Sequence, residues 1–313
     1  MSERFSRPRL IVTGASGQFG QLVLSELLNT HRIPARHIIA TTRSVDKLAR
    51  FANLGGIVRQ ADFNHGDALA SAFCGGERML LISTAPAELP YVDGVRLLQH
   101  SAAIEAARIA GVKHVLYTSG PNPEPGTPAF WLADHYRTEL ALLNSGLQWT
   151  ILRNWEWPDW HLRQHWIGAL RSGEYFAASG RGTSNHVTRD DCARAAAAAL
   201  VSDKAENRRY DVTGSAPLTI DEILAIVSEL CGGSIRVLHG TPEQYEARLL
   251  EEGVDASVIP FYVGYARAVR AGRYAGTTLA LQELTGKAPH SLRDFLHPQI
   301  DFMRSQVALA ADR

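Results

Sequence analysis

The stretch Arg9-Leu10-Ile11-Val12-Thr13-Gly14-Ala15-Ser16-Gly17-Gln18-Phe19-Gly20 predicts the fold of the chain. Residues 10–12 form a short apolar run, typical of a strand buried on both faces, and three glycines follow it with the spacing GxxGxxG. Residues 21–29 then show helical periodicity. A glycine turn between a strand and a helix allows a tight bend and a close approach to a pyrophosphate, and the helix N-terminus favours phosphate. The stretch therefore predicts a dinucleotide site that is formed by Gly14, Ala15, Ser16, Gly17, Gln18, Phe19 and Gly20.

Short apolar runs alternate with helical patterns from residue 9 to residue 153. This alternation predicts an α/β fold, a Rossmann-type doubly wound parallel sheet. The expected strands are residues 10–12, 37–42, 57–60, 79–83, 112–118 and 148–152, and the clearest expected helices are 90–110 and 131–144. We expect an NADP-binding Rossmann domain over residues 9–153, with returning segments at about 187–213. Residues 154–186 and 214–313 would form a smaller C-terminal substrate-binding lobe.

The bulk composition excludes several classes of protein. The 313 residues are 45% hydrophobic and 20% charged, and 32 basic residues balance 32 acidic ones, so no overall positive field attracts nucleic acid. Cys74, Cys192 and Cys231 are too widely separated for a disulfide framework or a zinc ribbon. The first residues lack the apolar core of a signal peptide, and no apolar stretch could span a bilayer. We expect a cytoplasmic protein with no nucleic-acid partner, no membrane partner and no metal.

The end of the second expected strand indicates which dinucleotide is bound. NAD sites carry an acidic residue in this region, whereas this chain has Arg43, close to the roughly 20-residue spacing of such fingerprints. A guanidinium can bind a 2′-phosphate through two hydrogen bonds, which favours NADP(H) over NAD(H). A surface arginine with no ligand is the alternative. Asp62 and Phe63, after the third expected strand, suit positions beside the adenine, and an acidic helix cap is the alternative there.

Small and aromatic residues indicate where further ligand contacts would lie. Ser83, Thr84 and Thr118 stand near the ends of expected strands, the edge at which open α/β sheets bind ligands. Ser119 could bond a substrate oxygen or equally satisfy strand-end backbone. Flat aromatic side chains suit stacking on a flat acceptor, so we expect at least one tryptophan in the substrate pocket. For each tryptophan, the alternative is core packing between the two lobes. The candidate substrate residues in these regions are Tyr91, Trp131 and Trp160.

These residues together resemble a known family, the NmrA-like atypical short-chain dehydrogenases/reductases. Within it the chain is most similar to bacterial type-two quinone oxidoreductases and triphenylmethane reductases. The resemblance covers roughly residues 9–230 and is weak past residue 235. The matching runs are residues 13–20, residues 33–39 leading to Arg43, and residues 58–63, 80–83, 110–115, 117–119, 152–154, 187–189 and 210–212.

The resemblance implies an NADP(H) cofactor and assigns contacts to matching positions. The glycine turn would hold the pyrophosphate and Arg43 the 2′-phosphate. The loop that begins at Ala85 would border the cofactor, and the residues after the sixth expected strand would border the nicotinamide. Arg189 would point into the same cleft as a further substrate residue, with a surface position at a helix start as the alternative. The cofactor-binding residues beyond the turn are therefore Arg43, Asp62, Phe63, Ser83, Thr84, Ala85, Pro86, Thr118, Asn154, Trp155, Glu156 and Trp157.

The catalytic pair of ordinary short-chain dehydrogenases is absent. Those enzymes use Tyr-x-x-x-Lys after the fifth strand, where the lysine lowers the pKa of the tyrosine. Here His135 and Glu139 occupy the two positions, one helical turn apart on one face. This departure argues against alcohol dehydrogenation but permits hydride transfer to an electrophilic quinone or cationic dye. His135 is the candidate proton donor, because an unperturbed histidine titrates near neutral pH. A His135–Glu139 pair that only holds the helix in place is the alternative.

The sequence thus predicts a reductase that uses NADPH to transfer hydride to a quinone or another planar conjugated small molecule. One alternative is an NADPH-dependent reductase of a specific biosynthetic or catabolic ketone or enone. The other is a non-enzymatic, NADP-binding redox sensor that regulates a partner. The oligomeric state is open, with a homodimer as the option we consider.

Overall fold

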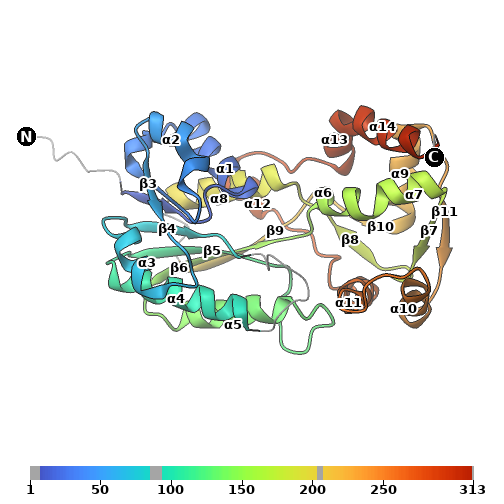
Figure 1. The fold of residues 1–313 in the computed structure, drawn as a ribbon, viewed down its shortest axis with the longest axis horizontal. Helices are drawn as coiled ribbons and strands as arrows, with labels where there is room; N and C mark the ends of the chain where they lie inside the picture. Colours follow the sequence, from blue (N-terminus) through green and yellow to red (C-terminus); the bar gives the residue numbers. More distant parts are fainter. Residues whose placement is uncertain (1–7, 85–93, 203–206, 312–313) are drawn as a thin grey trace, which may run out of the picture. The chain divides into compact units, whose positions relative to one another are not determined.

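The computed structural model of the chain describes residues 8–84, 94–202 and 207–311 (Figure 1). Among these residues, one seven-stranded sheet has the order β3-β2-β1-β4-β5-β6-β9. β1 pairs in parallel with β2 and β4, β2 pairs in parallel with β3, and β5 pairs in parallel with β4 and β6. The predicted Rossmann-type doubly wound sheet is confirmed. Its strands are β1 (Leu10–Val12), β2 (Ile38–Thr42), β3 (Ile57–Gln60), β4 (Arg78–Leu81), β5 (His114–Ser119), β6 (Gln148–Asn154) and β9 (Arg208–Val212).

Helices cover both faces of this sheet because its central strands are apolar on both sides. Figure 1 shows α3 (Gly66–Phe73), α4 (Val95–Ile109) and α5 (Leu132–Leu143) on one face, and α1 (Gln18–Ser25) and α8 (Arg189–Val201) on the other. Alternate residues of the strands, such as Ile11, Met79 and Val115, pack against α3, α4 and α5. The remaining elements here are η1 (Glu26–Thr30), η2 (Ala35–His37), η3 (Val45–Leu48) and α2 (Ala49–Asn53).

The strand and helix boundaries differ from the predicted ones by a few residues. β4 begins at Arg78 and ends at Leu81, where the expected strand spans residues 79–83. β5 begins at His114 rather than at residue 112, because Gly111 adopts a positive φ of 77° as the chain leaves α4. The described part of the expected helix 90–110 is Val95–Ile109, and residues 90–93 lie outside the described residues.

The chain divides into two compact units. The first comprises the described residues of Met1–Gly120, Asp134–Arg153 and Cys192–Tyr210. The second comprises those of Pro121–Ala133, Asn154–Asp191 and Asp211–Arg313. Each unit therefore contains segments that are far apart in the sequence.

The second unit has two small sheets and its own core. β8 (Thr183–Asn185) and β10 (Pro217–Thr219) are antiparallel, whereas β7 (Glu174–Ala177) and β11 (Arg236–His239) are parallel. A core cluster around Trp166 includes Ile223, Leu224 and Leu296. Its helices are α6 (Pro158–His161), η4 (Leu162–Trp166), α7 (Ile167–Ser172), α9 (Ile220–Cys231), α10 (Pro242–Glu251), α11 (Ile259–Arg270), α12 (Ala280–Thr285), α13 (Leu292–Leu296), η5 (His297–Gln299) and α14 (Ile300–Ala311). No helix in the described part of the chain is both long enough and apolar enough to cross a membrane.

Candidate active site

The glycine turn between β1 and α1 lets other atoms approach its backbone closely. Gly14 has a positive φ of 57°, and its carbonyl accepts a hydrogen bond of 3.0 Å from the Gly17 amide. A Cβ on Gly20 would lie 2.5 Å from the Gly14 oxygen and 2.7 Å from the Ala15 Cα, so α1 packs directly on the turn. Gly17 stands at the N-cap of α1 and offers no capping side chain. The turn thus presents a helix N-terminus that can receive phosphate.

The end of β2 lies beside this turn. The hydroxyls of Ser16 and Thr42 are 2.6 Å apart, which places the next residue, Arg43, close to the glycines. Arg43 is exposed and makes no hydrogen bond or ion pair with the residues that the structure describes. After β3, the Asp62 carboxylate accepts a hydrogen bond from the Asn64 amide, and Phe63 packs against the core. Of these groups, Arg43 is the one whose charge remains available to a ligand.

The ends of β4 and β5 are tied together by short side chains. The Ser83 amide donates to the Thr118 hydroxyl at 2.8 Å, and the Thr84 amide donates to Nε2 of His100 at 3.0 Å. Because Nε2 of His100 accepts this bond, the imidazole is neutral. Burial lowers the pKa of His100 to about 3, which agrees with this assignment. The predicted contacts Ala85, Pro86 and Tyr91 lie outside the described residues.

His135 and Glu139 have separate partners rather than each other. Nδ1 of His135 lies 2.7 Å from the Tyr117 hydroxyl, and the imidazole is buried. Burial, with a smaller effect from Arg96 and then His100, holds the pKa of His135 well below 6.5. The imidazole is therefore neutral at pH 7. A proton-donor role for His135 stays a prediction, which this low pKa does not favour.

Glu139 is the centre of a buried ionic network. Its carboxylate is 2% exposed and accepts 2.9 Å and 2.7 Å bonds from the Arg153 guanidinium. The Ser119 hydroxyl donates to the same carboxylate at 2.7 Å, so it is occupied by a side chain and not by strand-end backbone. Arg153 is not among the site residues that the sequence predicts. Tyr117 and Ser119 are two residues apart on β5 and therefore face the same side of the sheet. This spacing is the sequence signal that could have predicted their partners on α5.

The residues after β6 belong to the second unit, and most are already engaged. Asn154 ends β6, and its Oδ1 is buried with no hydrogen-bond partner among the described residues. The Trp155 indole donates to Asp211 at 3.2 Å. The Arg189 guanidinium lies 4.6 Å above the Trp157 ring and 2.7 Å from the Asp159 carboxylate. Asn154 therefore keeps an unused acceptor.

The two candidate substrate tryptophans lie together. The ring centroids of Trp131 and Trp160 are 4.2 Å and 5.5 Å from that of Phe261 on α11. Both indoles retain partial exposure. The second unit thus has an aromatic surface on which a flat molecule could stack.

Glu156 faces buried histidines that the sequence did not connect with it. Its Oε2 lies 3.2 Å from Nε2 of His161, and its backbone pairs with His186 in an isolated parallel bridge. Burial raises the pKa of Glu156 to about 7. Burial also lowers the pKa values of His161, His165 and His186 to about 3, so these imidazoles are neutral.

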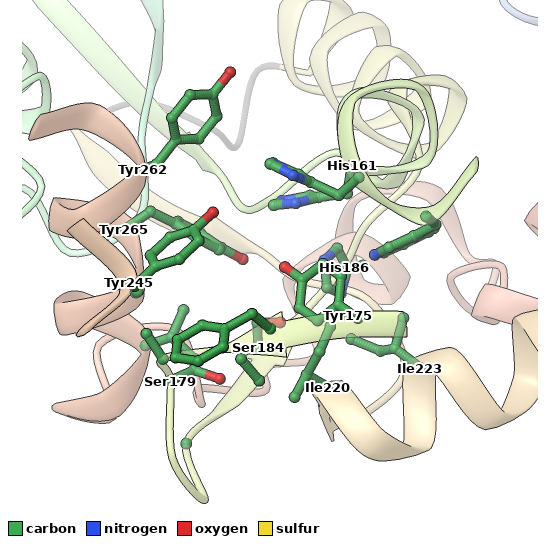
Figure 2. A pocket seen from close by; sticks show the side chains of 18 residues that line it. His161, Tyr175, Ser179, Ser184, His186, Ile220, Ile223, Tyr245, Tyr262 and Tyr265 are labelled. Carbon is green, nitrogen blue, oxygen red and sulfur yellow. The ribbon is translucent and has the colours of Figure 1, made fainter. Parts of the chain in front are cut away.

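The three histidines line a cavity of about 50 Å³ within the second unit. Figure 2 shows tyrosines of α10 and α11 along one side of it and His161 and His186 along another. Both ring nitrogens of His186 are buried with no hydrogen-bond partner among the described residues. In the described part of the chain, no three His, Cys, Asp or Glu side chains form a group that could hold a metal ion.

Comparisons with known proteins agree with this geometry. A family model described as NAD(P)H-binding matches residues 14–203. Quinone oxidoreductase 2 of Escherichia coli (strain K12) is 34% identical over 246 residues, which cover 78% of this chain and 82% of that protein.

Two solved structures extend the likeness over nearly the whole chain. The NADPH-dependent quinone oxidoreductase from Escherichia coli, complexed with NADPH, matches with a TM-score of 0.84 at 30% identity, and covers 92% of this chain and 98% of that one. The Citrobacter sp. triphenylmethane reductase complexed with NADP(H) matches with a TM-score of 0.80 at 32% identity. The match covers 93% of this chain and 99% of that one. Both structures hold the cofactor that the glycine turn predicts here.

Proposed function

Because the chain belongs to the family of NAD(P)H-binding proteins and is an NAD(P)H-dependent oxidoreductase, we propose that it reduces a quinone or another planar conjugated acceptor with NADPH. The observation that carries this proposal is the glycine turn with Arg43 beside it, in a chain that is similar over most of its length to a quinone reductase. The related quinone and triphenylmethane reductases support an acceptor that is flat and electrophilic.

The residues present fit NADP(H). The turn at Gly14, Gly17 and Gly20 leaves backbone room for a pyrophosphate at the N-terminus of α1. Arg43 carries an unpaired charge for a 2′-phosphate. The orphaned Oδ1 of Asn154 can accept a hydrogen bond, as the carboxamide of a nicotinamide would offer. When bound, the reduced nicotinamide supplies the hydride.

The chain itself positions the reactants. Glu139, held by Arg153 and Ser119, fixes α5 against the ends of β5 and β6. The aromatic surface of Trp131, Trp160 and Phe261 offers flat contact area for the acceptor. An acceptor that is already electrophilic needs orientation and a proton, and it does not need the Tyr-x-x-x-Lys pair.

The test is a steady-state assay of NADPH and NADH oxidation with 1,4-benzoquinone, menadione and a cationic triarylmethyl dye. We expect quinone-dependent oxidation, with NADPH preferred over NADH. Absence of turnover with every acceptor, despite NADPH binding, would overturn the proposal and favour a non-enzymatic sensor.

A homodimer and a cytoplasmic location are also proposals. The three well-separated cysteines support a reducing compartment. Light scattering on the purified chain, with and without NADPH, measures the oligomeric state directly.

A further inference from the structure

We propose that Glu156 is the proton donor of this reductase: its carboxyl group gives a proton to the acceptor oxygen that hydride transfer leaves negatively charged. This inference rests on the proposed function. The sequence predicts only a cofactor contact for Glu156. It replaces His135, whose buried neutral imidazole is bonded to Tyr117.

Glu156 lies just beyond the end of a strand of the large sheet. Asn154 is the last residue of β6, and Glu156 follows two residues later, which an extended chain spans in roughly 7 Å. Ligands of open α/β sheets bind at the carboxyl ends of the strands. The Glu156 side chain retains 19% exposure, so it is not fully shielded from solvent.

The surroundings of Glu156 favour its protonated form. It is faced by His161 of α6, by His186 after β8, and by Tyr265 and Tyr274 of α11 and the segment after it. Among the described residues, no arginine or lysine forms an ion pair with it. A carboxyl group surrounded by neutral rings holds its proton near neutral pH, as its raised pKa of about 7 indicates.

The adjacent cavity offers a route by which the proton can be replaced. His161, which contacts Glu156, and His186 both line it, and their ring centroids are 5.1 Å apart. A volume of about 50 Å³ accommodates roughly three water molecules at about 15 Å³ each. The unpartnered nitrogens of His186 give such water a polar contact. Figure 2 shows the His161 side chain directed into this space.

The proton balance is simple. A quinone that gains a hydride holds two more electrons and one negative charge on oxygen. The O–H bond of Glu156 breaks, a new O–H bond forms on that oxygen, and the product leaves as a neutral hydroquinone. The Glu156 carboxylate then regains a proton from water by way of His161. A cationic triarylmethyl dye becomes neutral on gaining hydride alone and requires no proton.

The test compares the two kinds of acceptor in the full-length Glu156→Gln variant. Glutamine keeps the shape of a neutral carboxyl group but cannot donate an acidic proton. We expect the ratio of the quinone rate to the dye rate to fall at least tenfold, because a missing general acid typically costs 10²–10⁴ in rate. Glu174→Gln is the matched control. That carboxylate lies in the same unit and pairs with Arg236 and Arg248, so the ratio should be unchanged.

The pH profile separates a proton donor from a residue that only supports the fold. The acid form of Glu156 is the active one, so the wild-type quinone rate should be full below pH 7 and fall as pH rises through about 7. Glu156→Gln should show a low rate without this transition, and Glu156→Asp should restore it in part. An unchanged rate ratio, or the same pH transition in Glu156→Gln, would overturn the inference. A wild-type protein that reduces no quinone would instead refute the proposed function.

Discussion

Arg43 and Arg153 are two arginines of the first unit with different surroundings. Arg153 forms two charge-assisted hydrogen bonds to Glu139 and is 20% exposed, so its charge is neutralised internally. Arg43 is exposed at the end of β2 and makes no hydrogen bond or ion pair with the described residues. An arginine that has no such contact and lies beside a glycine turn is explained best by a ligand.

Replacing Arg43 tests the preference for NADPH. Hydrogen bonds to a charged group contribute about 1.5–3 kcal/mol, so Arg43→Ala should raise the Kd of NADPH roughly 10- to 100-fold. The Kd of NADH, which lacks the 2′-phosphate, should change little. Fluorescence titration of the six tryptophans measures both. Arg36→Ala, an exposed arginine at the opposite end of β2, is the control, and equal losses for both nucleotides would contradict the role of Arg43.

Gly20 tests the packing of α1 on the turn. Its added Cβ would meet backbone atoms at 2.5 Å and 2.7 Å, which cannot yield as a flexible side chain would. We expect Gly20→Ala to destabilise the protein by about 1–3 kcal/mol and to weaken NADPH binding. Gly168→Ala on α7, where a Cβ meets nothing within 4 Å, should leave stability unchanged or improve it. Urea denaturation of both variants measures the difference, and equal stability would refute the packing argument.

At the scale of elements, α5 joins two strands through two independent contacts. His135 bonds Tyr117, and four residues later Glu139 bonds Ser119 on the same strand and Arg153 on β6. The helical repeat of α5 thus matches the two-residue repeat of β5. In ordinary short-chain dehydrogenases this face carries the catalytic pair, whereas here the described contacts are structural.

Removal of the Glu139 carboxylate should therefore cost stability before activity. Glu139→Ala removes the carboxylate that accepts two hydrogen bonds from Arg153, at a cost of about 2–3 kcal/mol, moderated by the partial exposure of Arg153. Thermal unfolding should show a clearly lower Tm, whereas the Kd of NADPH should stay the same. Glu105→Ala, which breaks an exposed pair with Arg108, should leave the Tm unchanged. A Kd that rises with an unaltered Tm would argue that Glu139 contacts the ligand.

Local patterns predicted the elements of the first unit well because its strands are short, apolar and flanked by glycine. β1 and β3 have the predicted bounds. The contacts between elements were harder to predict. The Ser119–Glu139–Arg153 network joins three elements, and Glu156 meets His186 thirty residues later through a single bridge. Such contacts depend on how strands and helices are arranged in space, which periodicity does not encode.

At the scale of the whole molecule, cofactor binding should stabilise the fold unevenly. NADPH at 100 times its Kd adds about 2.7 kcal/mol to the free energy of unfolding of the form that binds it. Hydrogen exchange should slow most at β1, the glycine turn and the end of β2, and much less at β7 and β11 of the second unit. Arg43→Ala should reduce this protection. Uniform slowing over both units would contradict a cofactor site centred on the turn.

The division of the second unit into three separated segments has a consequence for synthesis on the ribosome. All seven strands of the large sheet have been made once Val212 is added, whereas the rest of the second unit, residues 213–313, follows. At about 5–20 residues per second, these last residues take roughly 5–20 s. During this interval the nascent chain carries Trp166 and its apolar neighbours without α9, α13 and α14, against which they will pack. A ribosome-bound chaperone would find its strongest target in this interval, in the segment from Asn154 to Asp191.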